Sequence, residues 1–211
     1  GETSLAADLH CPGMRLFVGI PLADDGTSEL SALVSRLQPK AGDLRWTAPD
    51  SWHITLQFLG NATPAQFECL TARLGEVRYA PVAIELGAAG SFERAGVIFA
   101  EVIVAPGLAA LQQHIVAATA QCGFVAETRP FHPHITLARK ARNKGAREQG
   151  SKGTERSRQG SLYLRGLVES ARFSRFLRFM AHEFLLYESH LGSEGSRYEV
   201  RARFPLGGRS S

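Results

Sequence analysis

The stretch Phe131–Arg139, FHPHITLAR, holds a tetrapeptide that occurs twice in the chain. His134-Ile135-Thr136-Leu137 repeats His53-Ile54-Thr55-Leu56. Successive side chains of a β-strand point to opposite faces, so the histidine and threonine of each copy share one face while isoleucine and leucine share the other. Each copy therefore predicts a strand that is anchored in a core on one side and presents an imidazole and a hydroxyl on the other.

The elements that precede the two copies also repeat. An apolar strand at Met14–Ile20 and a helix with apolar residues at 30, 33, 34 and 37 come before the first copy. An apolar strand at 97–104 and a helix opened by Pro106 and ended by Gly123 come before the second. From strand start to histidine the chain runs 39 residues (14 to 53) and 37 residues (97 to 134). This near-duplication predicts two similar lobes related by a pseudo-two-fold axis, with the histidine strands meeting at a cleft.

The remaining elements complete an α+β architecture. We expect a short strand at 44–47, a helix capped by Thr63 and Gln66, strands at 81–86 and 184–187, a short helix near 173–177 and an alternating strand at 198–204. Thr27 or Ser28 is the expected cap of the first helix, and Phe58 is expected to face inward. The predicted fold is bilobal, with central β-sheets lining the cleft and helices outside.

Length and composition favour one bilobal domain at 14–207, with an N-terminal tail at 1–13 and a C-terminal tail at 208–211. No apolar run approaches the roughly 18–20 residues of a membrane span, and the first residues lack the pattern of a secretory signal. The three cysteines, Cys11, Cys69 and Cys122, have neither metal-ligand nor redox spacing. Together these features predict a cytoplasmic protein with reduced cysteines.

The positive charge is concentrated in one segment. Residues 138–160 contain eight Lys or Arg and two Glu, which gives +6, while the whole chain carries +4 and the remainder therefore −2. We interpret about 140–160 as a basic, flexible insertion. Its charge either keeps a solvated loop soluble or attracts a polyanion, and the sequence leaves both open.

The repeated residues suit acid–base chemistry on a phosphate. One imidazole can take a proton near neutral pH while the other gives one, and the hydroxyls of Thr55 and Thr136 can hold phosphate oxygens. His132 shares the strand face of His134 and raises a metal site as an alternative, but no further ligand has suitable spacing, so we expect neither metal nor cofactor.

Three other residues near the repeats have open roles. Strict alternation puts Arg139 on the face of Ile135, so it reaches the imidazole side only if the strand ends or bulges after Leu137. Trp46 and Phe131 suit either base stacking or core packing.

With these motifs the chain resembles the 2H phosphoesterase superfamily, and most closely the bacterial RNA 2′,3′-cyclic phosphodiesterases, also called 2′-5′ RNA ligases. The resemblance rests on MRLFVGI at 14–20, Arg45-Trp46, WHITLQFLG at 52–60, Gly123-Phe124 leading into RPFHPHITLAR at 129–139, and FPL at 204–206. Two features depart from the family pattern, namely Trp52, where an aliphatic residue is usual, and the basic insertion.

The resemblance implies metal-independent hydrolysis of a 2′,3′-cyclic phosphate at an RNA end to a 2′-phosphate, extending to reversible 2′-5′ ligation. It implies His53 as proton donor, His134 as proton acceptor, and Thr55, Thr136 and Arg139 as substrate-binding residues. The partner would be RNA, no cofactor would be needed, and the protein would act as a monomer.

Two other functions remain as alternatives. One is a superfamily phosphodiesterase that acts on small cyclic nucleotides or on 2′-5′ oligonucleotides, against which the basic insertion argues mildly. The other is a non-catalytic RNA-binding module, which would not require two titrating groups.

Overall fold

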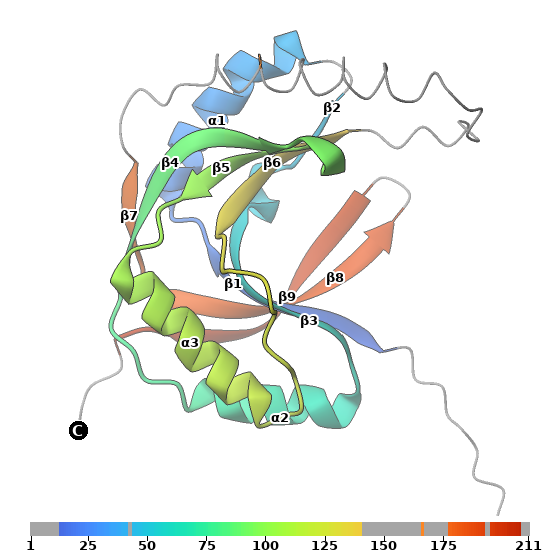
Figure 1. Ribbon diagram of the computed structural model, residues 1–211, viewed down its shortest axis with the longest axis vertical. Coiled ribbons are helices and arrows are strands. Elements are labelled where there is room, and N and C mark those ends of the chain that lie inside the picture. Colours follow the sequence, from blue (N-terminus) through green and yellow to red (C-terminus); the bar gives the residue numbers. More distant parts are fainter. Residues whose placement is uncertain (1–12, 42–43, 141–165, 167–176, 193–194, 208–211) are drawn as a thin grey trace, which may run out of the picture.

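Two antiparallel sheets form the centre of the molecule (Figure 1). The structure, a computed structural model, describes residues 13–41, 44–140, 166, 177–192 and 195–207. Sheet A has the strand order β3 (His53–Ala62), β1 (Met14–Pro21), β8 (Glu183–Gly192) and β9 (Gly195–Pro205). Sheet B has the order β2 (Leu44–Trp46), β6 (His134–Lys140), β5 (Val97–Val102), β4 (Val82–Phe92) and β7 (Arg178–Ala181). The two histidine strands therefore belong to different sheets, as the duplication predicts.

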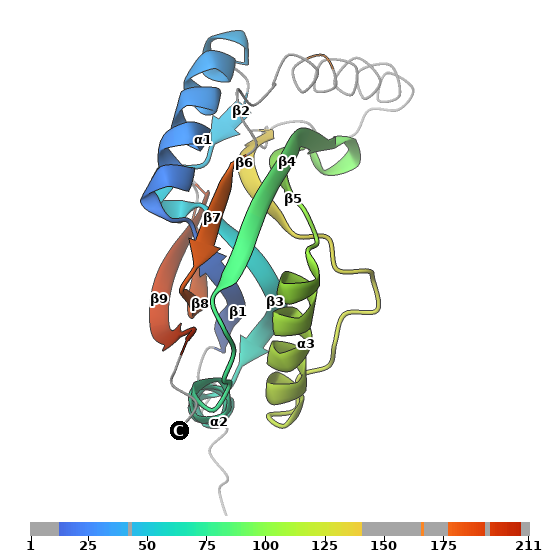
Figure 2. The ribbon, with the colours of Figure 1, turned by 90° about the vertical axis from the view of Figure 1, so that its left-hand side faces the viewer.

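In the described ranges, helices α1 (Asp24–Leu37), α2 (Pro64–Gly75) and α3 (Pro106–Ala120) lie outside the sheets (Figures 1 and 2). Helix α1 lies at one end of the molecule and contacts β7, whereas α2 and α3 pack together at the other end. Short 3₁₀ helices occupy Gln38–Lys40, Pro49–Ser51 and Glu93–Ala95. In the described part of the chain, no helix combines the length and apolar character that crossing a membrane requires. The predicted α+β fold, with two sheets and outer helices, is confirmed.

The predicted N-terminal caps of the helices agree with the structure at α2 but not at α1. At α2 the hydroxyl of Thr63 accepts from the Gln66 backbone while the Gln66 side chain accepts from the Thr63 backbone, so the predicted capping box is confirmed. The predicted cap of α1 is wrong, because the helix begins at Asp24 and the Thr27 hydroxyl donates to the Ala23 carbonyl inside the first turn. Strand β7 was not predicted. The expected helix near 173–177 and the basic insertion beyond Lys140 fall outside the described residues, apart from Leu177.

One large apolar core joins the inner faces of both sheets to the helices. Ile54 and Leu56 of β3 and Ile135 and Leu137 of β6 are buried in it, as the alternation predicts. A second, smaller group lies on the other face of sheet A and consists of Phe17, Leu185 and Tyr187 with Tyr198 packed against them. We call these four residues the aromatic cluster.

Both histidine strands contain a bulge at the same offset. The pairing register of β3 shifts between Val18 and Gly19 of its neighbour β1, and that of β6 shifts between Ile98 and Phe99 of β5. In consequence two consecutive residues of each strand are buried, and the next residue returns to the histidine face. The expectation that Phe58 faces inward is therefore wrong: its side chain is 56% exposed.

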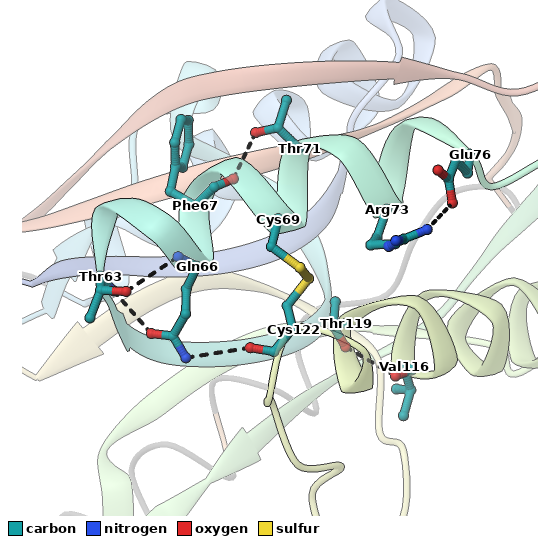
Figure 3. The surroundings of a disulfide bond; sticks show 10 residues. All are labelled: Thr63, Gln66, Phe67, Cys69, Thr71, Arg73, Glu76, Val116, Thr119 and Cys122. Carbon is teal, nitrogen blue, oxygen red and sulfur yellow. Dashed lines mark hydrogen bonds and ion pairs between the residues drawn. A yellow bond between two sulfur atoms is a disulfide. The ribbon is translucent and has the colours of Figure 1, made fainter.

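A disulfide joins α2 to the turn after α3 (Figure 3). Cys69 and Cys122, 53 residues apart, have Cα atoms 5.8 Å apart, and the Gln66 side chain donates to the Cys122 carbonyl. The packing of two helices that are distant in sequence brings the sulfur atoms together. The expectation of reduced cysteines is thus wrong for this pair.

Candidate active site

The two histidines open their strands in the same way. His53 is the first residue of β3 and His134 the first of β6. The Nδ1 atom of His53 lies 2.8 Å from the Ser51 carbonyl oxygen, and Nδ1 of His134 lies 2.9 Å from the His132 carbonyl oxygen. Because a carbonyl only accepts, each Nδ1 carries a hydrogen, and each neutral imidazole keeps Nε2 as an acceptor. Both side chains are therefore fixed in the tautomer that can exchange a proton through Nε2.

Aromatic rings surround the imidazole of His53. Its ring centroid lies 4.7 Å from that of Phe17, 4.8 Å from that of Tyr198 and 5.5 Å from that of Tyr187. The Tyr198 contact is edge-to-face, at an interplanar angle of 81°. The hydrogen bond to Ser51 and the rings of the aromatic cluster on sheet A together fix the orientation of the His53 imidazole.

His134 has a comparable environment on sheet B. Phe92 and Phe99 meet its ring at centroid distances of 5.1 and 5.3 Å. Phe99 in turn requires a glycine beside it, since a Cβ on Gly90 would lie 2.4 Å from the Phe99 Cζ atom. Phe99 of β5 supports its histidine from the neighbouring strand, as Phe17 of β1 does in sheet A.

Burial lowers the pKa of both imidazoles. Loss of solvent lowers the pKa of His53 to about 4. The Ser51 carbonyl opposes this shift, while the charge of Arg139, and that of His134 when it is protonated, adds to it. The pKa of His134 is also lowered, chiefly by burial and further by His132 and Arg139, while the His132 carbonyl opposes the shift. In the free protein at pH 7 both imidazoles are therefore neutral.

Arg139 lies on the imidazole side because of the bulge in β6. Its guanidinium approaches the Thr136 hydroxyl to 3.5 Å, the outer limit of a hydrogen bond, and its charge acts on both histidines. The condition under which Arg139 could take part is thus met. Alternation within each strand places Thr55 and Thr136, both half-buried, on the same side as their histidines, and the two strands β3 and β6 contact each other.

Phe58 is a candidate site residue that the sequence analysis missed. It follows His53 by five residues, as Arg139 follows His134, and both side chains are exposed beyond equivalent bulges. The equal offset within the repeat was the signal that could have identified it. An aromatic ring from sheet A and a guanidinium from sheet B therefore occupy matching positions.

The other candidates do not extend the site. Within the described ranges no group of three or more His, Cys, Asp or Glu could hold a metal ion. The rings of His132 and His134 are 6.0 Å apart, and His132 is exposed. Trp46 and Phe131 pack against the main core, which favours their interpretation as core residues.

A cavity of about 160 Å³ lies beside His53. Its walls come from β8, β9, the end of β1 and the turn that precedes β3. The residues of this turn, Asp50–Trp52, also include the carbonyl that orients His53. Space for a ligand is therefore present on the sheet A side of the two histidines.

Comparison with known proteins adds independent findings. The family model of the 2′-5′ RNA ligase superfamily matches residues 21–174. The RNA 2′,3′-cyclic phosphodiesterase of Bacillus subtilis (strain 168) is 33% identical over 129 residues, covering 59% of this chain and 70% of that protein. The protein of the same name from Escherichia coli (strain K12) is 33% identical over 129 residues, covering 60% and 72%. The crystal structure of E. coli LigT in apo form superposes with a TM-score of 0.67 at 25% identity, covering 92% of this chain and 98% of that one.

Proposed function

The chain belongs to the 2′-5′ RNA ligase superfamily, and we propose that it hydrolyses RNA 2′,3′-cyclic phosphate ends to 2′-phosphomonoesters. One observation carries the proposal: two imidazoles from different sheets, each fixed with Nε2 available, lie together with Arg139. Two proton-transfer groups and one cation are what the opening of a cyclic phosphate requires.

In the proposed reaction His134 is the base and His53 the acid. Nε2 of His134 accepts a proton from a water molecule as its oxygen attacks phosphorus. The bond from phosphorus to O3′ breaks, and Nε2 of His53 donates a proton to the departing O3′. The phosphate stays on O2′, which gives the 2′-phosphomonoester. Arg139 and the hydroxyls of Thr55 and Thr136 stabilise the charge that develops on the non-bridging oxygens.

The acid must acquire its proton when the substrate binds. In the free protein His53 is neutral at pH 7, because burial lowers its pKa to about 4. A cyclic phosphate carries a negative charge, and an anion beside an imidazole favours the imidazolium and raises its pKa. Substrate binding therefore supplies the charge that makes His53 an acid.

The RNA is recognised from both sheets. Phe58 offers an exposed aromatic face on which the terminal base can stack. Because one chain supplies both imidazoles, a monomer suffices for catalysis.

The experiment uses an RNA that ends in a 2′,3′-cyclic phosphate, incubated with the protein in EDTA. We expect a 2′-phosphate product, with ligated RNA appearing only if a ribose hydroxyl replaces water. His53→Ala and His134→Ala should each lower the rate by about 10²–10⁴ without loss of fold, whereas His182→Ala, at an exposed position, should not. Absence of turnover by the wild-type protein, or a wild-type rate in either histidine variant, would refute the proposal.

A second substrate assigns the two roles. Replacement of O3′ by sulfur creates a leaving group that hardly needs a proton. On this substrate His53→Ala should regain much of its lost rate and His134→Ala should not. Rescue of His134→Ala instead would exchange the two roles.

A further inference from the structure

The cavity beside His53 is lined by apolar and by charged side chains. Tyr187, Tyr198 and Val200 contribute apolar surface from β8 and β9. Asp50 and Arg203 contribute a carboxylate and a guanidinium. This combination of apolar walls with both an acceptor and a donor distinguishes the cavity from the surroundings of the reacting phosphate, where Arg139 provides a cation.

The polar groups of the cavity keep hydrogen-bonding capacity for a ligand. Arg203 donates one bond of 2.8 Å to Glu183, and a guanidinium has five N–H donors. The Asp50 carboxylate accepts from the Ser51 hydroxyl at 3.2 Å and has further acceptor sites. The Glu183 carboxylate bonded to Arg203 and the Asp50 carboxylate in the lining disfavour a free anion as the occupant. A nucleobase fits better, because it has flat apolar faces and an edge that carries donors and acceptors.

The proposed reaction determines where the rest of the RNA lies. Water attacks from the side of His134, so O3′ and the ribose that bears it lie on the side of His53. Every nucleotide on the 5′ side of this ribose must then also leave the site on the side of sheet A. The base is attached at C1′ and the 5′ chain continues from C4′, the two carbons that flank the ring oxygen, so the two substituents extend in different directions.

Sheet A offers two different directions for these two substituents. Phe58 lies farther along the edge strand β3, whereas the cavity extends from His53 across β8 and β9. With the terminal base on Phe58, the 5′ chain is directed towards the cavity.

We propose that the cavity is a subsite for the nucleotide that precedes the cyclic end. Its base packs against Tyr198 and Val200 and bonds through its edge to Arg203 and Asp50. The inference rests on the proposed function and adds a substrate preference to it: the protein favours RNA chains of two or more nucleotides over a cyclic mononucleotide.

The test compares kcat/KM on three substrates. These are a nucleoside 2′,3′-cyclic phosphate, a dinucleotide that ends in the same cyclic nucleotide, and that dinucleotide without its 5′ base. We expect the wild-type protein to favour the complete dinucleotide by about tenfold over either of the others, the size of effect that one stacked base provides.

Two variants and one control locate the effect. Arg203→Gln should lower kcat/KM on the dinucleotide about tenfold, mainly through KM, and change the mononucleotide less than twofold. Val200→Trp should fill the cavity and remove the preference for the dinucleotide. Arg201→Gln is the matched control: it changes the same charge on the same strand, but Arg201 lies over the Phe67 ring of α2 and bonds to Glu188.

Three results would overturn the inference while leaving the proposed function intact. They are equal kcat/KM on the mononucleotide and the dinucleotide, an unchanged preference without the 5′ base, and an equal loss on all substrates in Arg203→Gln. A wild-type protein without activity on any of the three substrates would instead refute the proposed function, and the subsite with it.

Discussion

Burial of the His53 imidazole predicts a specific loss of stability in acid. Phe17, Tyr187 and Tyr198 surround the ring, and its pKa falls to about 4 in the folded protein from 6.5 in an exposed chain. Above pH 6.5 the imidazole is neutral in both states. Between pH 6.5 and 4 the unfolded chain binds a proton that the folded protein does not, so stability falls as the pH falls.

The size of the effect follows from the two pKa values. Their separation corresponds to about 3 kcal/mol once the pH is below both. Between pH 7 and pH 5, where the unfolded chain has become protonated and the folded protein has not, the expected loss is about 2 kcal/mol. This is a substantial part of the 5–15 kcal/mol that stabilises a typical domain, roughly speaking.

The assay is urea unfolding at pH 7 and pH 5 of the oxidised wild-type protein and of His53→Gln, which keeps a polar side chain and removes the titrating group. The loss of unfolding free energy between the two pH values should be smaller in His53→Gln by about 2 kcal/mol. His182→Gln, at an exposed position, should behave as the wild type.

Equal pH dependence of wild type and His53→Gln would refute the reasoning. A direct readout exists as well, since the ring protons of His53 report its titration by NMR. A midpoint above pH 6 in the free protein would show that the aromatic cluster does not desolvate the imidazole.

The packing around the second histidine, the disulfide and the paired imidazoles each predict a further measurable effect. Gly90→Ala places a methyl group 2.4 Å from the Phe99 ring, so it should lower the free energy of chemical unfolding by about 1–3 kcal/mol and also lower kcat/KM. Gly107→Ala, whose methyl group would lie 3.8 Å from its nearest neighbour, should change neither quantity. The double variant Cys69→Ser/Cys122→Ser should lose about 2–4 kcal/mol of unfolding free energy, and wild type reduced with dithiothreitol should lose the same amount; equal stability with and without reductant would contradict the cross-link. Because the pKa values of both imidazoles are lowered in the free protein, kcat/KM should rise as the pH is lowered from 8 towards 6.5. The value of kcat reports the substrate-bound protein and should stay high up to a higher pH than kcat/KM does. Coincident profiles of kcat and kcat/KM would show that the bound phosphate does not raise the pKa values.

The sequence predicted those parts of the site that follow from local rules. Period-two alternation placed His53 and Thr55 opposite Ile54 and Leu56, and the structure agrees up to that point. Alternation then failed at Phe58, because the bulge depends on the pairing register with β1, which no property of β3 alone determines. The same failure in β6 is what brings Arg139 to its histidine.

Contacts between distant elements were beyond the reach of sequence reasoning. Tyr187, Tyr198 and Arg203 come from strands far from the first histidine motif, and no spacing links them to it. Cys69 and Cys122 are joined only because α2 and α3 pack together. The expected cytoplasmic location stays a prediction, and the disulfide argues against it, since such bonds persist mainly in oxidising compartments.

The strand order of sheet A has a consequence for the order in which the protein is made. β1 lies between β3 and β8, so the first strands of the chain pair with the last strands that the structure describes. A ribosome delivers His53 early, but Tyr187 and Tyr198, which hold its ring, emerge only after every described strand of sheet B has been translated. In sheet B, by contrast, the histidine strand β6 and its neighbours β5 and β4 are all translated before β8. The nascent chain should therefore assemble the surroundings of the second histidine first. A chain that stops before β8 would lack the rings that orient His53, so an incomplete protein would not act on RNA.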